Sequence, residues 1–426
     1  MQAPVWITGV GSAVPERVLT NEEIERGMPW LDTTARWIEE HVGVCERRIV
    51  APREAATDLA LRAARQALQR AGVRAGEIEL LLHATNTAEE SFPAGAARIL
   101  AGLQRESGEN IHAGGIDLQQ GCASFLGGVR LAAGMIAAGE ISTALVTGAD
   151  VASRMVDWTD RSTCILLGDG ACAAVLVGDP QRASRGAVRL RYRAGYTETD
   201  PGLADAIRRD ANLPRWNDPY LFLGREVERE RAKEHFYGHA GALAFGAGYS
   251  PFFRMEGRDV YRFVKRVVPR RGYLEVLQRA GRLASGGDAL GERIASLRSL
   301  EQVECSAERE AIVARCAASF DLLIPHQPNL YLLLELAEQM GVPLERMYVN
   351  IARYGNTSAP SIGIALEEAL RVPSRYTTLT RRDALGRATV EGREVETPMF
   401  AVGQSALLLS FGAGNSWNYA LFDREA

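Results

Sequence analysis

Three polar residues stand at turns that follow expected strands, and together they could carry out acyl transfer. Cys122 lies in Gly121-Cys122-Ala123-Ser124, where an expected strand gives way to a helix. Unpaired N–H groups at a helix start favour the thiolate, which is the nucleophilic form of cysteine. His326 follows a buried strand and is flanked by prolines, and Asn356 lies in a second strand-to-helix turn. A thiol, a histidine and an amide donor at such turns predict one shared pocket for acyl transfer.

Each of these residues also has an ordinary structural interpretation. Cys122 could be a small buried thiol, His326 a hydrogen-bonded structural histidine and Asn356 a helix N-cap. His235 and His239 could share one helical face, but no third ligand accompanies them, so we expect no metal site. The five other cysteines show no zinc-ligand spacing and predict no disulfide framework: Cys45, Cys164, Cys172, Cys305 and Cys316.

The elements around Cys122 are expected to alternate between strands and helices. Strands are predicted over residues 5–11, 78–85, 113–118, 143–148 and 171–177. Helices are predicted over residues 57–72, 93–103 and 123–138. Strands that alternate with helices of this length indicate an α/β sheet covered by helices.

The second half of the chain shows the same alternation with longer interruptions. Strands are predicted over residues 320–325, 347–350, 405–411 and 417–422, with a hairpin over 375–400. Helices are predicted over residues 257–280, 284–319, 328–341 and 358–371. Gly121-Cys122 and Gly355-Asn356 each open a helix after a strand, which indicates a faint internal repeat.

Composition and charge exclude several classes of protein. The 426 residues include 49 Lys and Arg against 53 Asp and Glu, for a formal net charge of −4. This balance excludes a protein held to nucleic acid mainly by bulk positive charge. The chain has no uninterrupted apolar run of about eighteen residues and no signal peptide pattern at its start. We therefore expect a cytoplasmic protein with no membrane and no nucleic-acid partner.

Five short motifs occur in the order in which one enzyme family carries them. They are Gly121-Cys122-Ala123, Leu167-Gly-Asp-Gly-Ala171, His326-Gln-x-Asn329, Gly355-Asn-Thr-Ser358 and Phe411-Gly-x-Gly414. With them the chain resembles the thiolase-fold condensing enzymes of the β-ketoacyl-acyl-carrier-protein synthase III group, as a divergent member from specialised metabolism. The resemblance implies a five-layered αβαβα architecture built from two related halves.

The resemblance also divides the chain and places its insertions. Residues 1–180 would form the half with the nucleophile, and residues 181–426 the half with the histidine and asparagine. Insertions are expected near residues 197–255, 281–319 and 375–400. The first of these is rich in aromatic residues, which would form a cap or a reshaped substrate entrance.

The family implies a Cys–His–Asn triad with a defined division of labour. Cys122 would be acylated by a thioester, and His326 and Asn356 would bind the carbonyl of a malonyl-type thioester and stabilise its enolate. The backbone N–H groups of Cys122 and Ala413 would hold the oxyanion of the acyl intermediate. The family has glycine at position 413, and alanine is compatible with this role if its φ stays negative.

Further residues match the family's binding positions. Trp37 and Arg161 stand where the family sandwiches the adenine of coenzyme A, and Phe92 matches a residue that crosses the interface of a homodimer. Arg262, near Lys265 and Arg266, would contact an acyl carrier protein, although a solvated basic helix face is an equal reading. No permanently bound cofactor is implied, since acyl-CoA or acyl-carrier-protein thioesters are the substrates.

Two other functions are open at this level. An acyltransferase of the same fold would pass the acyl group from Cys122 to a hydroxyl, amine or thiol acceptor. A non-catalytic subunit of a larger synthase would need no triad, and the intact Cys122, His326 and Asn356 argue against it.

Overall fold

The computed structural model describes most of the chain and leaves some segments undescribed. The described residues are 3–184, 186–203, 206–208, 252–266, 272–283, 288–379, 381–382, 388–390 and 392–426. His235, His239 and most of the aromatic residues expected in the first insertion lie outside these ranges.

Nine strands form one mixed sheet that runs through the whole molecule. Its order is β11 (Leu322–Pro325), β16 (Ser405–Gly412), β17 (Ser416–Glu425), β8 (Arg189–Thr199), β1 (Trp6–Ala13), β7 (Asp169–Val177), β6 (Thr143–Val151), β4 (Leu80–Ala84) and β5 (Gly114–Leu118). The pairing of β1 with β8 joins the two halves of this order, because Trp6 and Ile7 pair antiparallel with Arg191 and Leu190.

The same sequence of strand neighbours occurs on both sides of this joint. Outward from β1, the neighbours are antiparallel β7, antiparallel β6 and parallel β4. Outward from β8, they are antiparallel β17, antiparallel β16 and parallel β11. The parallel strand β5 beyond β4 has a shorter counterpart beyond β11, namely a parallel bridge between Leu323 and Met347. The fold is therefore thiolase-like with two related halves, while a chain division at residue 180 stays a prediction.

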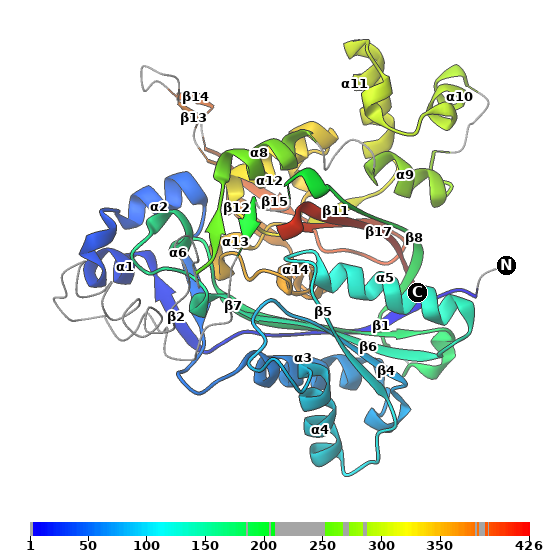
Figure 1. Cartoon of the computed structure of the whole chain (residues 1–426). Helices are drawn as coiled ribbons and strands as arrows, with labels where there is room; N and C mark the ends of the chain where they lie inside the picture. The colour runs from blue at the N-terminus through cyan, green and yellow to red at the C-terminus, as the bar shows by residue number, and fades with distance from the viewer. Residues whose placement is uncertain are drawn as a thin grey trace.

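Helices cover both outer faces and fill the space between the two halves (Figure 1). α3 (Ala56–Ala71) and α4 (Gly95–Ser107) lie on one outer face, while α8 (Gly257–Arg266), α9 (Gly272–Arg279) and α12 (Leu330–Met340) lie on the other. α5 (Ser124–Ala138) and α14 (Ser361–Ala369) lie between and pack against strands of both halves. These helices and the two sheet halves make the five expected layers.

The position of each helix follows from the distribution of its apolar residues. The buried residues of α3 are alanines and leucines at helical spacing, and they form one stripe against β1, β6 and β7. Gly9 and Gly11 of β1 permit a close approach, since a Cβ on Gly9 would lie 2.1 Å from the Ala67 carbonyl oxygen.

The central helix is apolar on most of its surface because it is packed on two sides. In the described part of the chain, the segment Gly121–Ala138 that contains α5 is long and apolar enough to span a membrane. Half of that segment is buried inside the protein, and α5 packs against β4, β6 and β17. Its composition is explained by this core position, as expected for a helix that is hydrophobic all round.

Three elements differ from the expectations from sequence. β8 was not expected, since its charged side chains at 189, 191 and 193 hide the alternation of a strand that pairs on both sides. The helix expected over residues 257–280 is two helices, α8 and α9. The strand expected over residues 347–350 is reduced to the single bridge at Met347.

The expected insertions contain their own small elements. The first includes a ribbon of β9 (Ile207–Arg208) and β10 (Arg254–Met255), and the second includes α10 (Ala289–Ser296) and α11 (Ser306–Ala317). In the third, β12 (Ser374–Thr377) pairs antiparallel with β15 (Glu394–Thr397), so the expected hairpin is confirmed.

Candidate active site

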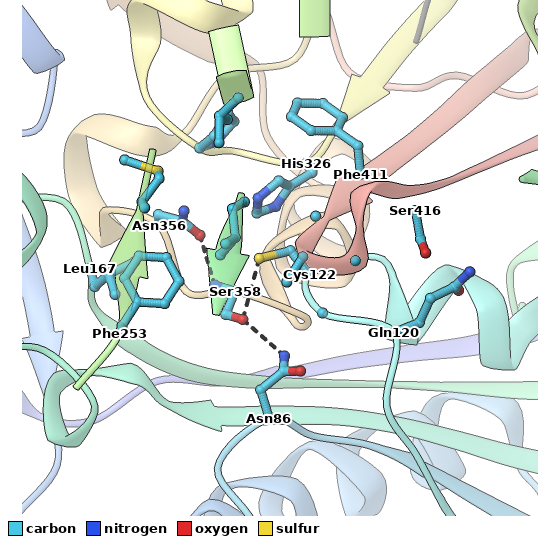
Figure 2. A pocket seen from close by; sticks show the side chains of 18 of the residues that line it. Asn86, Gln120, Cys122, Leu167, Phe253, His326, Asn356, Ser358, Phe411 and Ser416 are labelled. Carbon is cyan, nitrogen blue, oxygen red and sulfur yellow. Dashed lines mark hydrogen bonds between the residues drawn. The ribbon is translucent and has the colours of Figure 1, made fainter. Parts of the chain in front are cut away.

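A cavity of about 760 Å³ lies at the junction of the two halves, and the three candidate residues line it. Cys122 comes from the turn before α5, His326 from the end of β11 and Asn356 from the turn before α14. Figure 2 shows their side chains converging from these separate segments. His326 and Asn356 lie 204 and 234 positions after Cys122 in the sequence. All three nevertheless line one site, as their positions at turns predicted.

Two glycine-dependent contacts place Cys122 against the turn between β16 and β17. Gly121 has a φ of +56°, a left-handed backbone that glycine adopts without strain. A Cβ on Gly121 would lie 2.6 Å from the Ala413 nitrogen, and a Cβ on Gly412 would lie 2.5 Å from the Cys122 nitrogen. The two turns therefore touch each other, and the backbone nitrogens of Cys122 and Ala413 both lie where they touch.

The alanine at position 413 is compatible with its expected role. The non-glycine residues with positive φ in the described chain are Asp32, Ser358 and Asn415, so Ala413 keeps a negative φ. The left-handed conformation in this turn falls instead on Gly414, with a φ of +78°, and on Asn415. The backbone N–H at position 413 thus does not require glycine.

Burial opposes the thiolate that the helix start was expected to favour. It raises the pKa of Cys122 to about 12, and this effect outweighs the hydrogen bond with Ser358, which acts in the opposite direction. α5 begins at Ser124, two residues after the thiol. The expectation of a thiolate from the helix start alone was wrong, because desolvation of the charged sulfur is the larger effect.

His326 is buried and held as a neutral imidazole. Burial lowers its pKa to about 3, and its Nδ1 lies 2.5 Å from the Ser361 hydroxyl oxygen. The backbone N–H of Gln327 donates to the same oxygen at 3.3 Å. If the Ser361 hydroxyl donates to Nδ1, the ring hydrogen lies on Nε2, which is then a donor. The Phe411 ring packs edge-on against the imidazole, with ring centroids 5.3 Å apart.

This burial predicts a pH-dependent contribution to stability. Between pH 7 and pH 5 the unfolded histidine takes up a proton while folded His326 stays neutral, so stability falls as pH decreases. A His326→Gln variant is expected to lose about 2 kcal/mol less unfolding free energy than wild type over this interval. Urea unfolding at both pH values measures the difference, and equal losses in the two proteins would contradict it.

Asn356 is held by hydrogen bonds on both its backbone and its side chain. Its N–H donates to the Leu166 carbonyl at 2.8 Å, and its own carbonyl accepts from Gly168 at 3.0 Å. Its Oδ1 accepts the Ser358 backbone N–H at 2.8 Å. Because Oδ1 is engaged, the Nδ2 group is the part of this amide that remains to donate toward a ligand.

Sequence reasoning missed three polar residues beside the nucleophile. The Ser358 hydroxyl oxygen lies 3.5 Å from the Cys122 sulfur, and Asn86 Nδ2 donates to that oxygen at 3.2 Å. Asn86 in turn contacts buried Asp150. Ser358 is part of the Gly355-Asn-Thr-Ser358 motif, but Asn86 and Asp150 carry no motif, and only the tertiary structure brings them to the thiol.

The other predicted binding residues lie apart from the triad in the fold. Trp37 on α2 (Ala35–Val42) stacks on His41 with ring centroids 4.4 Å apart, and the Arg161 guanidinium lies 5.1 Å from the Trp37 ring centroid. Phe92 is 84% exposed. Arg262 on α8 is exposed, and its Nη1 lies 3.6 Å from Asp259 Oδ1.

Metal ligands are not grouped in the described part of the molecule. Among those residues no cluster of three or more His, Cys, Asp or Glu side chains could hold a metal ion. The cavity therefore presents a thiol, an imidazole, amides and hydroxyls as its chemical groups.

Comparisons with known proteins show the family of the chain. The family described as 3-oxoacyl-[acyl-carrier-protein] synthase III matches residues 116–193, and its C-terminal family matches residues 316–374. A β-ketoacyl-[acyl-carrier-protein] synthase III of Symbiobacterium thermophilum is 33% identical over 420 residues, covering 97% of this chain and 96% of the relative.

Solved structures of similar enzymes share the fold over nearly the whole chain. The 3-oxoacyl-(acyl carrier protein) synthase III of Pseudomonas aeruginosa has a TM-score of 0.66 at 27% identity, covering 99% of each chain. The synthase III of Thermus thermophilus has a TM-score of 0.66 at 28% identity, covering 97% of this chain and 98% of the other.

Proposed function

Since the chain belongs to the β-ketoacyl-acyl-carrier-protein synthase III family of condensing enzymes, we propose that Cys122, His326 and Asn356 join two thioesters by decarboxylative Claisen condensation. The observation that carries this proposal is the convergence of these three side chains on one cavity. A thiol can hold the acyl group there, while two neutral donors face the space where a second thioester would bind.

The first half-reaction loads the enzyme. The sulfur of Cys122 attacks the carbonyl of an acyl thioester, and a new C–S bond forms as the bond to the leaving thiol breaks. The proton of Cys122 ends on the departing thiol, so acyl-Cys122 and a free thiol are the products. The N–H groups of Cys122 and Ala413 support the oxyanion that forms between these two states.

The second half-reaction makes the carbon–carbon bond. His326 Nε2–H and Asn356 Nδ2 donate to the carbonyl of a malonyl-type thioester, whose carboxylate leaves as CO₂ and whose electrons form an enolate. The enolate carbon attacks acyl-Cys122, the C–S bond breaks, and the sulfur leaves with its electron pair. Uptake of one proton regenerates the thiol, and a β-ketoacyl thioester is released.

A neutral histidine suits this role better than a charged one. Burial keeps His326 uncharged at neutral pH, since it lowers the pKa to about 3. A neutral donor stabilises the enolate without a permanent positive charge that would also bind the starting carboxylate. We therefore assign His326 as a hydrogen-bond donor rather than as the base that deprotonates Cys122.

Coenzyme A is the proposed carrier of the acyl group. Trp37 and Arg161 already pack on one another, and adenine could take the place of the guanidinium on the indole face. For an acyl carrier protein, exposed Arg262 is the proposed contact. The positive charge of Lys265 is partly offset for such a contact, because its Nζ lies 3.1 Å from the Glu335 carboxylate of α12.

The proposed homodimer is supported by the edge strand β5 and by exposed apolar side chains. β5 is the last strand in the sheet order, and its Ile116 is 50% exposed. Leu131 of α5 and Phe92 are 54% and 84% exposed. An unpaired strand edge that exposes an apolar side chain is a surface that proteins usually cover. A second copy would cover it and bring Phe92 toward its neighbour.

An Ile116→Asp variant tests this interface. We expect wild type to sediment as two chains and the variant as one, because the carboxylate would be buried between the two β5 edges. Val402→Asp is the matched control, since Val402 is 56% exposed on the loop before β16. A dimer that persists in the Ile116→Asp protein would contradict the assignment.

One experiment separates condensation from simple acyl transfer. Purified protein is mixed with an acyl-CoA, and the mass of the Cys122 peptide is measured with and without malonyl-CoA or malonyl-acyl-carrier-protein. We expect an acyl adduct that discharges only with a malonyl thioester, with release of CO₂. An adduct that ignores malonyl thioesters but discharges to a hydroxyl or amine would instead support an acyltransferase, and no adduct would exclude both.

A further inference from the structure

A chain of hydrogen bonds runs from the Cys122 sulfur to a buried carboxylate. The Ser358 hydroxyl oxygen lies 3.5 Å from Sγ, Asn86 Nδ2 lies 3.2 Å from that oxygen, and the same Nδ2 lies 3.0 Å from Asp150 Oδ2. Figure 2 shows Ser358 between Cys122 and Asn86. These hydrogen bonds connect elements from both halves, since Asn86 follows β4, Asp150 lies on β6 and Ser358 precedes α14.

Asp150 is the acceptor at the end of this series of hydrogen bonds, because its partners are donors. Its carboxylate accepts the backbone N–H of Asn86 at 2.6 Å and that of Ala359 at 3.0 Å. The hydroxyls of Thr85 and Thr87 lie 3.3 Å and 3.2 Å from it. A side chain that is fully buried and surrounded by N–H groups is an acceptor.

The direction of every other bond follows from that acceptor. Asn86 must present its Nδ2 group to Asp150, and the second hydrogen of the same group points to Ser358. The Ser358 oxygen therefore accepts from Asn86. Its own hydrogen is then available for the Cys122 sulfur, which lies 3.5 Å away.

The backbone of Ser358 is also set in an unusual conformation that aims this hydroxyl. Its φ is +64°, in the left-handed region that serine rarely adopts. Two bonds hold it there, from the Ser358 N–H to Asn356 Oδ1 at 2.8 Å and from the next N–H, that of Ala359, to Asp150. The same turn thus orients both the Asn356 amide and the Ser358 hydroxyl.

We propose that Ser358 is a further catalytic residue, whose hydroxyl donates a hydrogen bond to the Cys122 sulfur, and that Asn86 and Asp150 position it. No proton is transferred in this contact. It stabilises the sulfur when it carries negative charge, which happens when Cys122 attacks the acyl thioester and again when it leaves during carbon–carbon bond formation. The cavity buries the sulfur, so a donor at this point opposes the desolvation that disfavours the thiolate.

The role of Ser358 rests on the proposed function of Cys122, but its test does not require acyl chemistry. The rate at which iodoacetamide alkylates Cys122 at pH 8 reports the availability of the thiolate. A Ser358→Ala variant is expected to react roughly ten- to a hundredfold more slowly, the range for losing a hydrogen bond to a charged atom. His326 lines the same cavity as the thiol, and the charge of Asp150 acts on the thiol; both groups remain in this variant.

A double-mutant cycle tests the positioning role of Asn86. Asn86→Ala is expected to slow alkylation in the wild-type background but to have no further effect in the Ser358→Ala background, because the oriented hydroxyl is already absent. A purely structural effect of Asn86 would persist in both backgrounds. Ser153→Ala is the matched control, since it removes another buried hydroxyl that donates to a different buried carboxylate, Asp169, at 2.7 Å.

The outcomes separate this proposal from the proposed function. If Ser358→Ala is alkylated at the wild-type rate, the donor role of Ser358 is wrong even if acyl-CoA still loads Cys122. If wild type forms no acyl adduct yet alkylation slows in the variant, the condensing function fails while the hydrogen bond stands. If Ser358→Ala does not fold, Asn86→Ala alone decides, and an unchanged rate in that protein overturns the proposal.

Discussion

A Cys122→Ala variant is expected to lose at least about four orders of magnitude in condensation rate, because no covalent acyl intermediate can form. The same variant should still release CO₂ from a malonyl thioester, since His326 and Asn356 remain in the cavity. Its two readouts are therefore β-keto product, which is lost, and decarboxylation, which is retained. Both are measured on one preparation, by mass spectrometry of the thioesters and by trapped CO₂.

A matched thiol provides the control for this variant. Cys305 is exposed at the start of α11, so Cys305→Ala is expected to keep both the acyl adduct and the condensation rate. If the acyl group is found on a cysteine other than Cys122, or if Cys122→Ala keeps its condensation rate, the nucleophile has been assigned wrongly.

The second large effect is expected from the two donors that face the malonyl thioester. His326→Ala and Asn356→Ala should each lower decarboxylation by about 10²- to 10³-fold, the range for removing one donor from an oxyanion site. Acylation of Cys122 should fall by less than about tenfold, because the N–H groups of Cys122 and Ala413 support that step. The measurements are single-turnover acylation by acyl-CoA and CO₂ release from malonyl-CoA.

A second buried histidine distinguishes this effect from a general loss of packing. His83 of β4 is buried and hydrogen-bonded to Thr147 at 2.9 Å, but it does not line the cavity. His83→Ala should disturb folding as His326→Ala does, while its folded fraction keeps the decarboxylation rate. If His326→Ala slows acylation as much as decarboxylation, then His326 instead assists the thiol directly.

Taken together, the variants assign separate steps to separate groups. In the proposed scheme, Cys122 holds the acyl group, His326 and Asn356 act on the second thioester, and Ser358 acts on the sulfur in both half-reactions. Each assignment predicts a different pattern of loss across alkylation, acylation and decarboxylation. A single defect shared by all variants would indicate a common structural cause.

Much of the fold could be predicted because its signals are local. A few turns of chain are enough to show the alanine and leucine stripe of α3 and the apolar runs of β16 and β17. The same holds for the glycines at 121 and 355, whose φ is positive in the structure. The motifs around Cys122, His326 and Asn356 are also short, so the triad could be proposed from sequence. The strand β8 was missed because its pattern is meaningful only with β1 and β17 on either side.

The chemical state of the site depends on properties that no local pattern contains. Sequence indicated a helix start that would favour a thiolate at Cys122, but burial raises the pKa of that thiol to about 12. Sequence could place His326 in a loop, but only the packing around it makes the imidazole neutral and sets the Ser361 hydroxyl beside Nδ1. Desolvation is a sum over all surrounding atoms, most of them distant in the chain.

By itself, the amino-acid sequence determined the layered α/β fold and the proposed triad that this fold positions, because short motifs and hydrophobic periodicity indicate both. Only the tertiary structure decided which further groups reach the nucleophile. Asn86 and Ser358 lie 272 positions apart, yet the junction of the two halves brings them into one hydrogen-bonded chain with Asp150. Such contacts arise from the packing of whole elements. The sequence around each residue therefore does not indicate which distant residue it will contact.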